Sequence, residues 1–237
     1  MKSSYYKYFA ALLLFGSNGI VASNINLPSY EIVLLRLLLG SLFLITVFTV
    51  SRQRFTFYRN KHTCLYLFIS ASTMGASWML LYEAYQQVGI SIASLAYYCG
   101  PVIVMILSPF LFRETLTWPK IAGFLTVLAG MCLVNLQALD EGKTIWGLFC
   151  GLMSAFMYAL MVTANKKAKP ESGLENSLLQ LVIGSFIVVA FVSMQKNFVL
   201  SLTTIDWIPV LLLGLLNTGI GCYLYFFSFT DFPVPSV

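Results

Sequence analysis

Long apolar runs separated by short polar segments are the main pattern along this chain. Each run lasts about 20 residues, the length that a helix needs to cross the hydrocarbon core of a bilayer. The runs predict eight transmembrane helices, at residues 8–24, 30–50, 65–85, 92–112, 119–137, 145–164, 177–194 and 208–228. The expected fold class is therefore an all-α polytopic membrane protein.

The chain also matches itself at a fixed offset of 144 residues. The coincidences that composition explains least well are Glu31 with Glu175, Gly40-Ser41 with Gly184-Ser185, and Gly75 with Gly219. Such a period predicts two related units, residues 1–140 with five helices and residues 141–237 with three. Because five is odd, the second unit starts on the opposite side of the membrane, so we expect repeats of inverted topology. Inverted repeats are typical of transporters.

Composition agrees with a membrane protein, since 59% of the residues are hydrophobic, only 10% are charged and the mean hydropathy is +0.83. A soluble domain carries about 25% charged residues. This chain has too few polar side chains to cover its surface in water. We therefore expect the lipid bilayer to be its solvent.

The distribution of Lys and Arg predicts the orientation. With the N-terminus in the cytoplasm, the basic residues of the inner loops are Lys2, Lys7, Arg52, Arg54, Arg59, Lys61, Arg113, Lys120, Lys166, Lys167 and Lys169. Only Lys143 and Lys196 then lie in outer loops. Since cytoplasmic loops are enriched in Lys and Arg, we expect a multi-pass protein of the plasma or inner membrane. The net charge of +5 is then an orientation signal, and we expect no nucleic-acid binding.

The sequence lacks the motifs of the common enzyme classes. It contains no GxSxG, no HExxH, no phosphate-binding loop and no Cys/His pairing. Its five cysteines fall in or near apolar runs without a CxxC pair. We therefore expect no enzyme, no metal, no cofactor and no disulfide.

Residues 100–130 resemble the end of the first repeat in the EamA-type drug/metabolite transporters, where a proline such as Pro101 opens the fourth helix and an acidic residue such as Glu114 closes it. Residues 15–18 and 35–40 are similar to the first and second helices of that family. The resemblance covers the whole chain. It implies ten helices in two repeats and the transport, often export, of amino acids, related solutes or drugs, usually coupled to protons or to exchange. Alternating access between the two repeats is the expected mechanism.

At the same offset, Val237 corresponds to Ala93, at the start of the fourth helix. Counterparts of helices nine and ten are therefore missing from the sequence given. We expect either a truncated or frameshifted gene product, which we favour, or a second, complementing polypeptide that supplies these helices. A homo-oligomer is a further assembly that we consider. The alternative to a working transporter is a non-transporting membrane fragment or a partner subunit of an intact transporter.

Two ionisable residues, Arg36 and Glu83, lie inside predicted spans near the same outer side. A charge within the bilayer is costly and marks a functional site by default. The pair is expected either to interact or to line a polar vestibule for the solute. The alternative is that Arg36 snorkels outward and Glu83 reaches interfacial water. Repeat two carries Gln180 in place of Arg36.

The remaining candidates for the substrate pathway are Asn18, Trp78, Tyr82, Tyr97, Tyr98, Pro101 and Asn217. Asn18 and Asn217 lie beside glycines and predict weak points that expose backbone groups, unless those glycines serve only helix packing. The aromatic residues are expected to form a wall for an organic solute, or else packing faces and interfacial belts. Pro101 predicts a kink toward the cavity.

Overall fold

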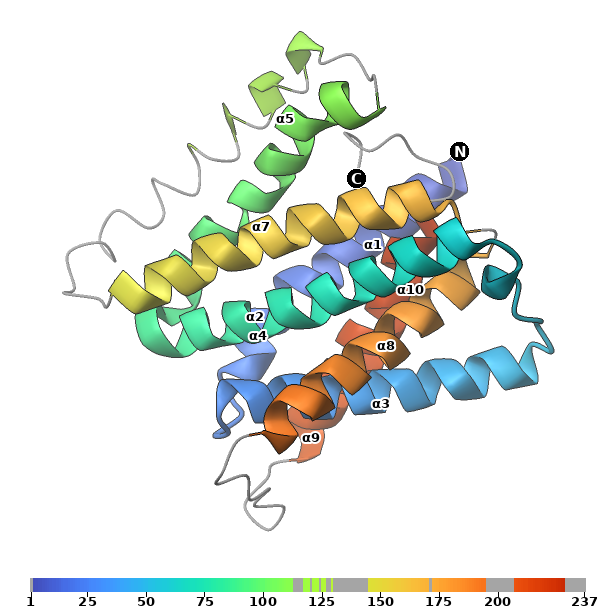
Figure 1. Ribbon diagram of the computed structural model, residues 1–237. Helices are drawn as coiled ribbons and strands as arrows, with labels where there is room; N and C mark the ends of the chain where they lie inside the picture. The colour runs from blue at the N-terminus through green and yellow to red at the C-terminus, as the bar shows by residue number, and fades with distance from the viewer. Residues whose placement is uncertain are drawn as a thin grey trace.

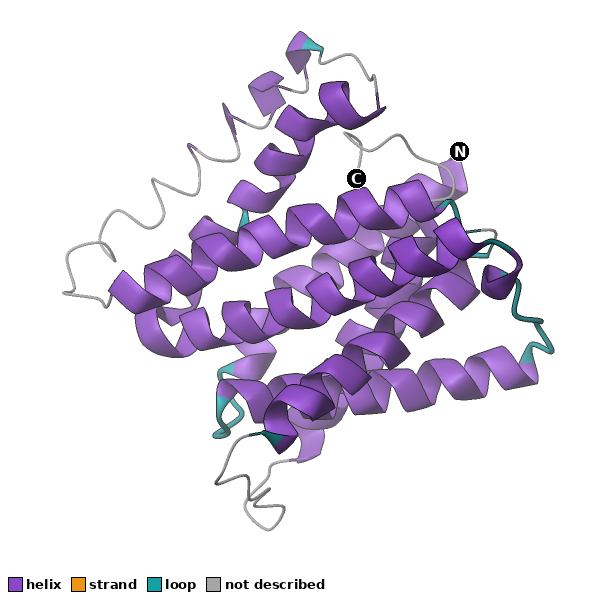
Figure 2. Cartoon of the chain, in the orientation of Figure 1, coloured by secondary structure: helices purple, strands orange, loops and turns teal. Residues whose placement is uncertain are grey.

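The computed structural model describes residues 2–112, 145–170, 172–194 and 207–228, with short stretches between 117 and 129. All regular structure in these residues is helical (Figure 2). Five helical segments within them are long and apolar enough to cross a membrane. The predicted class, an all-α polytopic membrane protein, is confirmed.

The helices follow the predicted spans in order (Figure 1). They are α1 (Lys2–Gly16), α2 (Asn18–Ala22), α3 (Ser29–Val50), the short 3₁₀-helix η1 (Phe57–Arg59), α4 (Lys61–Tyr97), α5 (Cys99–Phe112), α7 (Ile145–Ala168), α8 (Gly173–Ser193), α9 (Trp207–Leu211), the π-helix η4 (Leu212–Ile220) and α10 (Gly221–Ser228). The helix predicted at 119–137 lies for the most part outside the described residues, as do Glu114 and residues 229–237.

Helix boundaries differ from the prediction where the backbone breaks. The predicted helices 65–85 and 92–112 are instead α4, which continues to Tyr97, and α5. Within α4 the backbone turns at Gly89, whose φ of 81° is open to glycine and strained for other residues. The second break follows at Tyr98, because Pro101 has no N–H to donate to the carbonyl of Tyr97. The predicted helix four is thus divided between the end of α4 and α5.

Helices α4 and α7 form the most extensive helix pair and run side by side in Figure 1. The hydroxyl of Ser77 donates to the carbonyl of Ser154 at 2.9 Å, and the hydroxyl of Ser154 donates back at 2.7 Å. A methyl group added at Gly151 would lie only 2.8 Å from Cβ of Ala96. Small residues and hydroxyls of this kind hold helices together in lipid, where hydrophobic burial contributes little.

Helices α3 and α8 pack against each other and meet through equivalent residues. Ser41 on α3 and Ser185 on α8 are 144 positions apart, and their hydroxyl oxygens lie 3.3 Å from each other. Ser41 of the first half therefore touches its own counterpart in the second half. Contact between identical positions of two units is the mark of a twofold arrangement.

The glycines next to these serines make reciprocal contacts. A methyl group added at Gly40 would lie 2.8 Å from Cγ2 of Thr218, and one added at Gly184 would lie 3.2 Å from Cε of Met74. Thr218 is the counterpart of Met74 at the 144-residue offset. Helix α3 therefore packs on η4 as α8 packs on α4.

One buried carboxylate links the two halves in the first turn of α8. Glu175 accepts hydrogen bonds from the backbone N–H groups of Thr56 and Phe57, at 2.5 and 2.9 Å, and from the Thr56 hydroxyl at 2.6 Å. A carboxylate with three donors is well compensated for its burial. Glu175 thus fastens the segment between α3 and α4 to the second half.

We predict that Gly40→Ala lowers the free energy of unfolding by about 1 to 3 kcal/mol, because the added methyl would meet Thr218 and, at 3.3 Å, the carbonyl oxygen of Gly214. Unfolding in mixed micelles, followed by circular dichroism, measures the change. Gly16→Ala is the matched control, since a methyl there meets nothing within 4 Å. Equal stability of the two variants would contradict the close contact.

Glu175→Gln is expected to speed hydrogen exchange at the Thr56 and Phe57 amides by about tenfold, because charge-assisted hydrogen bonds contribute about 1.5 to 3 kcal/mol. Exchange measured by mass spectrometry on the peptide that contains both amides gives the rate. The His62 amide, which donates to Asn60 at 2.9 Å, is the internal control. If all three amides change alike, the effect is global unfolding and the assigned role of Glu175 is wrong.

Candidate functional site

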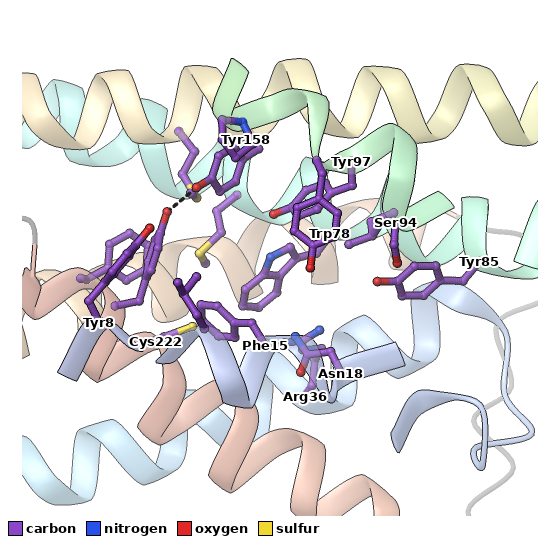
Figure 3. A pocket seen from close by; sticks show the side chains of 18 residues that line it. Tyr8, Phe15, Asn18, Arg36, Trp78, Tyr85, Ser94, Tyr97, Tyr158 and Cys222 are labelled. Carbon is purple, nitrogen blue, oxygen red and sulfur yellow. Dashed lines mark hydrogen bonds between the residues drawn. The ribbon is translucent and has the colours of Figure 1, made fainter. Parts of the chain in front are cut away.

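A pocket lies between helices of the first half and helices α7 and α10 of the second (Figure 3). Its cavity volume is about 140 Å³. The lining residues are Tyr8, Leu12, Phe15, Asn18, Arg36, Met74, Trp78, Leu81, Tyr85, Ser94, Tyr97, Tyr98, Pro101, Tyr158, Met161, Cys222, Tyr225 and Phe226.

Half of the residues that line the pocket are aromatic, and their side chains link the helices around it. The hydroxyls of Tyr158 on α7 and Tyr225 on α10 are hydrogen-bonded at 2.7 Å, as the dashed line in Figure 3 marks. The ring of Tyr97 meets Tyr158 edge-on with centroids 5.4 Å apart, and Tyr8 stacks on Tyr225 at 6.1 Å. The wall is therefore apolar over the ring faces and carries neutral hydroxyls that donate or accept hydrogen bonds.

Arg36 of α3 is the only Lys, Arg, Asp or Glu among the described lining residues. Its side chain is 1% exposed. Nε donates to the hydroxyl of Thr218 at 2.9 Å, and Nη1 donates to the hydroxyl of Tyr82 at 2.5 Å. The guanidinium carbon lies 4.1 Å from the centroid of the Trp78 ring, a cation–π contact. Arg36 thus points inward and does not snorkel to the membrane surface.

The break between α1 and α2 is held by Asn217. Ser17 separates the two helices, and the side-chain nitrogen of Asn217 lies 2.9 Å from the carbonyl of Leu14, the hydroxyl of Ser17 and the amide oxygen of Asn18. Backbone groups freed inside a membrane must find such partners. Asn217 therefore supports the pocket from behind, whereas Asn18 lines it.

The π-helix η4 brings the second half to this break. The hydroxyl of Thr218 donates to the carbonyl of Leu213, five residues earlier, at 2.7 Å, which matches the spacing of a π-helix. The same hydroxyl accepts from Arg36. The weak point that the sequence predicted around Asn217 is thus a wide helical turn that contacts both α3 and the α1–α2 break.

Three of the predicted candidates do not line the pocket: Asn217, Tyr82 and Glu83. Tyr82 lies behind Arg36 and holds Nη1. Glu83 accepts hydrogen bonds from the hydroxyl of Ser29 at 2.8 Å and from the amide of Gln87 at 3.0 Å. Arg36 and Glu83 therefore form no pair, contrary to one of the two expectations, and Glu83 belongs to the contact between α3 and α4.

The sequence reasoning missed the contribution of α1, α7 and α10, above all Tyr8, Phe15, Tyr158 and Tyr225. Aromatic residues within apolar runs carry no local signal that separates a pocket wall from a lipid-facing surface. The repeat held a signal, because α7 is the counterpart of the region around Asn18. If the region around Asn18 is expected to line the pocket, the twofold relation predicts that α7 lines it as well.

The arrangement suits the reversible binding of a small amphiphilic solute. It offers one fixed cation, several neutral hydroxyls and a large aromatic surface. In the described part of the chain, no group of three or more His, Cys, Asp or Glu side chains is placed to hold a metal ion.

Comparison with known proteins agrees with a transporter. The model of the EamA-like transporter family matches residues 3–136 and again residues 145–237. An uncharacterized transporter YxxF of Bacillus subtilis (strain 168) is 27% identical over 229 residues, which are 94% of this chain and 71% of that protein. An uncharacterized transporter in the sor 3'region of Acidianus ambivalens is 27% identical over 161 residues, 68% of this chain and 60% of that protein.

The fold also has a solved counterpart. A protein known by its crystal structure superposes with a TM-score of 0.77 at 18% identity, over 99% of this chain and 82% of that one. At this identity the likeness shows the fold alone. The two matches to the family model together span most of the sequence, and the chain belongs to the EamA-like transporter family.

Proposed function

We propose that the protein moves small metabolites, such as amino acids, related solutes or drugs, out of the cell by alternating access through the pocket. Residues 1–140 and 141–237 are the two inverted repeats, and the N-terminus is cytoplasmic in the plasma or inner membrane. The observation that carries the proposal is that one pocket is lined by both repeats. A solute bound there contacts two bodies at once, so their relative rotation changes its access.

The contact between α3 and α8 is suited to serve as the pivot. Ser41 and Ser185 lie at the centre of the twofold arrangement, where relative rotation displaces atoms least. The broken backbone is located elsewhere, at Ser17, Gly89 and Tyr98, around the ends of segments that line the pocket. These breaks are the segments expected to bend during transport.

Efflux by the 237-residue chain tests the proposal. In liposomes loaded with a panel of labelled amino acids and aromatic acids, we expect solute release that Ser94→Trp reduces at least about tenfold, because the indole would occupy the pocket. Release is followed as the loss of label from the vesicles. Ser193→Trp, at an exposed position of α8, is the matched control and is expected to retain release. Equal release from protein-free vesicles would contradict transport.

Orientation is tested by labelling single cysteines in a version without the native cysteines. We expect Asn26→Cys, exposed between α2 and α3, to react with a membrane-impermeant maleimide on intact cells. Arg54→Cys, exposed between α3 and α4, is expected to react only after permeabilisation. The reverse pattern would show that the N-terminus lies outside.

A further inference from the structure

We propose that Arg36 is an anion receptor and that the transported solute carries a carboxylate, which binds Nη2 of Arg36 while an apolar body lies against the aromatic wall. This inference rests on the proposed function, because it names the class of solute that the same pocket takes. It is carried by the hydrogen-bond inventory of Arg36.

A guanidinium has five N–H donors and no acceptor. Nε of Arg36 is used by Thr218, and Nη1 is used by Tyr82. Nη2 is buried and has no partner among the residues that the structure describes. A buried donor without an acceptor costs about 1 to 3 kcal/mol, and more when it is charged. The site is therefore incomplete at this one nitrogen.

The positive charge of Arg36 also lacks a negative partner within the described chain. Glu83 is engaged by Ser29 and Gln87 instead. The ring of Trp78 offsets part of the charge but offers no oxygen to Nη2. A buried cation without a counterion is unfavourable, so an anionic ligand would gain both the ion pair and the missing hydrogen bonds.

The pocket decides which anion fits. Figure 3 shows Arg36 and Asn18 on one side of the pocket and Tyr97 and Tyr158 on the opposite side. The two N–H groups of Nη2 suit a carboxylate, which accepts through either oxygen. Beyond it lie ring faces and neutral hydroxyls, which favour an apolar or aromatic body over a second charge. A small organic acid with one apolar group meets both conditions.

The other repeat supplies a natural comparison. Gln180 stands at the position equivalent to Arg36, is equally buried and lies outside the pocket. Its side-chain oxygen accepts from Ser70 at 3.2 Å, while its side-chain nitrogen, like Nη2 of Arg36, has no partner among the described residues. A neutral amide is therefore compatible with this helix position. Arg36→Gln therefore removes the charge and introduces the residue that the second half already has at the equivalent position.

Matched pairs of carboxylates and amides test the inference on the unmodified protein. The pairs are phenylacetate with phenylacetamide, indole-3-acetate with indole-3-acetamide, and isovalerate with isovaleramide. Binding to the purified chain in detergent is measured by equilibrium dialysis of the labelled compounds. We expect the carboxylate of each bound pair to bind at least about tenfold more tightly, as one charge-assisted pair implies.

Variants locate the effect. Arg36→Gln is expected to bring the carboxylate-to-amide ratio close to one, while Lys61→Gln, which removes a positive charge from an exposed site, leaves the ratio unchanged. Arg36→Lys keeps the charge and is expected to retain a reduced preference. Should Arg36→Gln fail to fold, the carboxylate-to-amide ratios of the unmodified protein and of Arg36→Lys still test the inference.

Two outcomes would overturn the inference in distinguishable ways. Equal binding of carboxylates and amides, with release from liposomes intact, would refute the anion receptor and leave the proposed function standing. The second outcome is that the unmodified protein binds no member of the pairs and also releases no solute from liposomes. This outcome would refute the pocket as a solute site and the proposed function with it.

Discussion

The close contact between α3 and α8 is the constraint on which the other features depend. Lipid tails are as apolar as leucine, so two helices stay together in a bilayer only where small residues let them approach and hydroxyls meet. Ser41 and Ser185 provide this contact, with Gly40 and Gly184 beside them. From this crossing α3 reaches η4 and α8 reaches α4, which leaves space for a pocket bounded by both halves.

Irregular backbone is concentrated where that pocket lies. The break at Ser17 and the π-helix η4 both free backbone groups, which are tolerated at membrane depth only with partners inside the protein. Asn217 and Thr218 provide those partners and at the same time contact Asn18 and Arg36. The breaks, their supports and the pocket wall thus form one connected unit.

Two buried ions show how differently the chain treats charge. Glu175 receives three hydrogen bonds from Thr56 and Phe57, so its charge is compensated and its role is to join the halves. Arg36 has partners for only part of its guanidinium, and its buried Nη2 has none among the described residues, although the side chain lines a cavity. Complete compensation characterises a structural ion, and incomplete compensation beside a cavity characterises a binding group.

The sequence by itself determined the membrane class, the order of the spans and the family, because apolar run length and a fixed-offset repeat are properties of the chain. It also singled out Arg36 and Asn18, since a charge or an amide inside an apolar span is visible without coordinates. Only the tertiary structure decided that Glu83 stays away from Arg36 and that Tyr158 and Tyr225 line the pocket. The facing of an aromatic residue within an apolar helix depends on which helix packs beside it, and local pattern does not encode that neighbour.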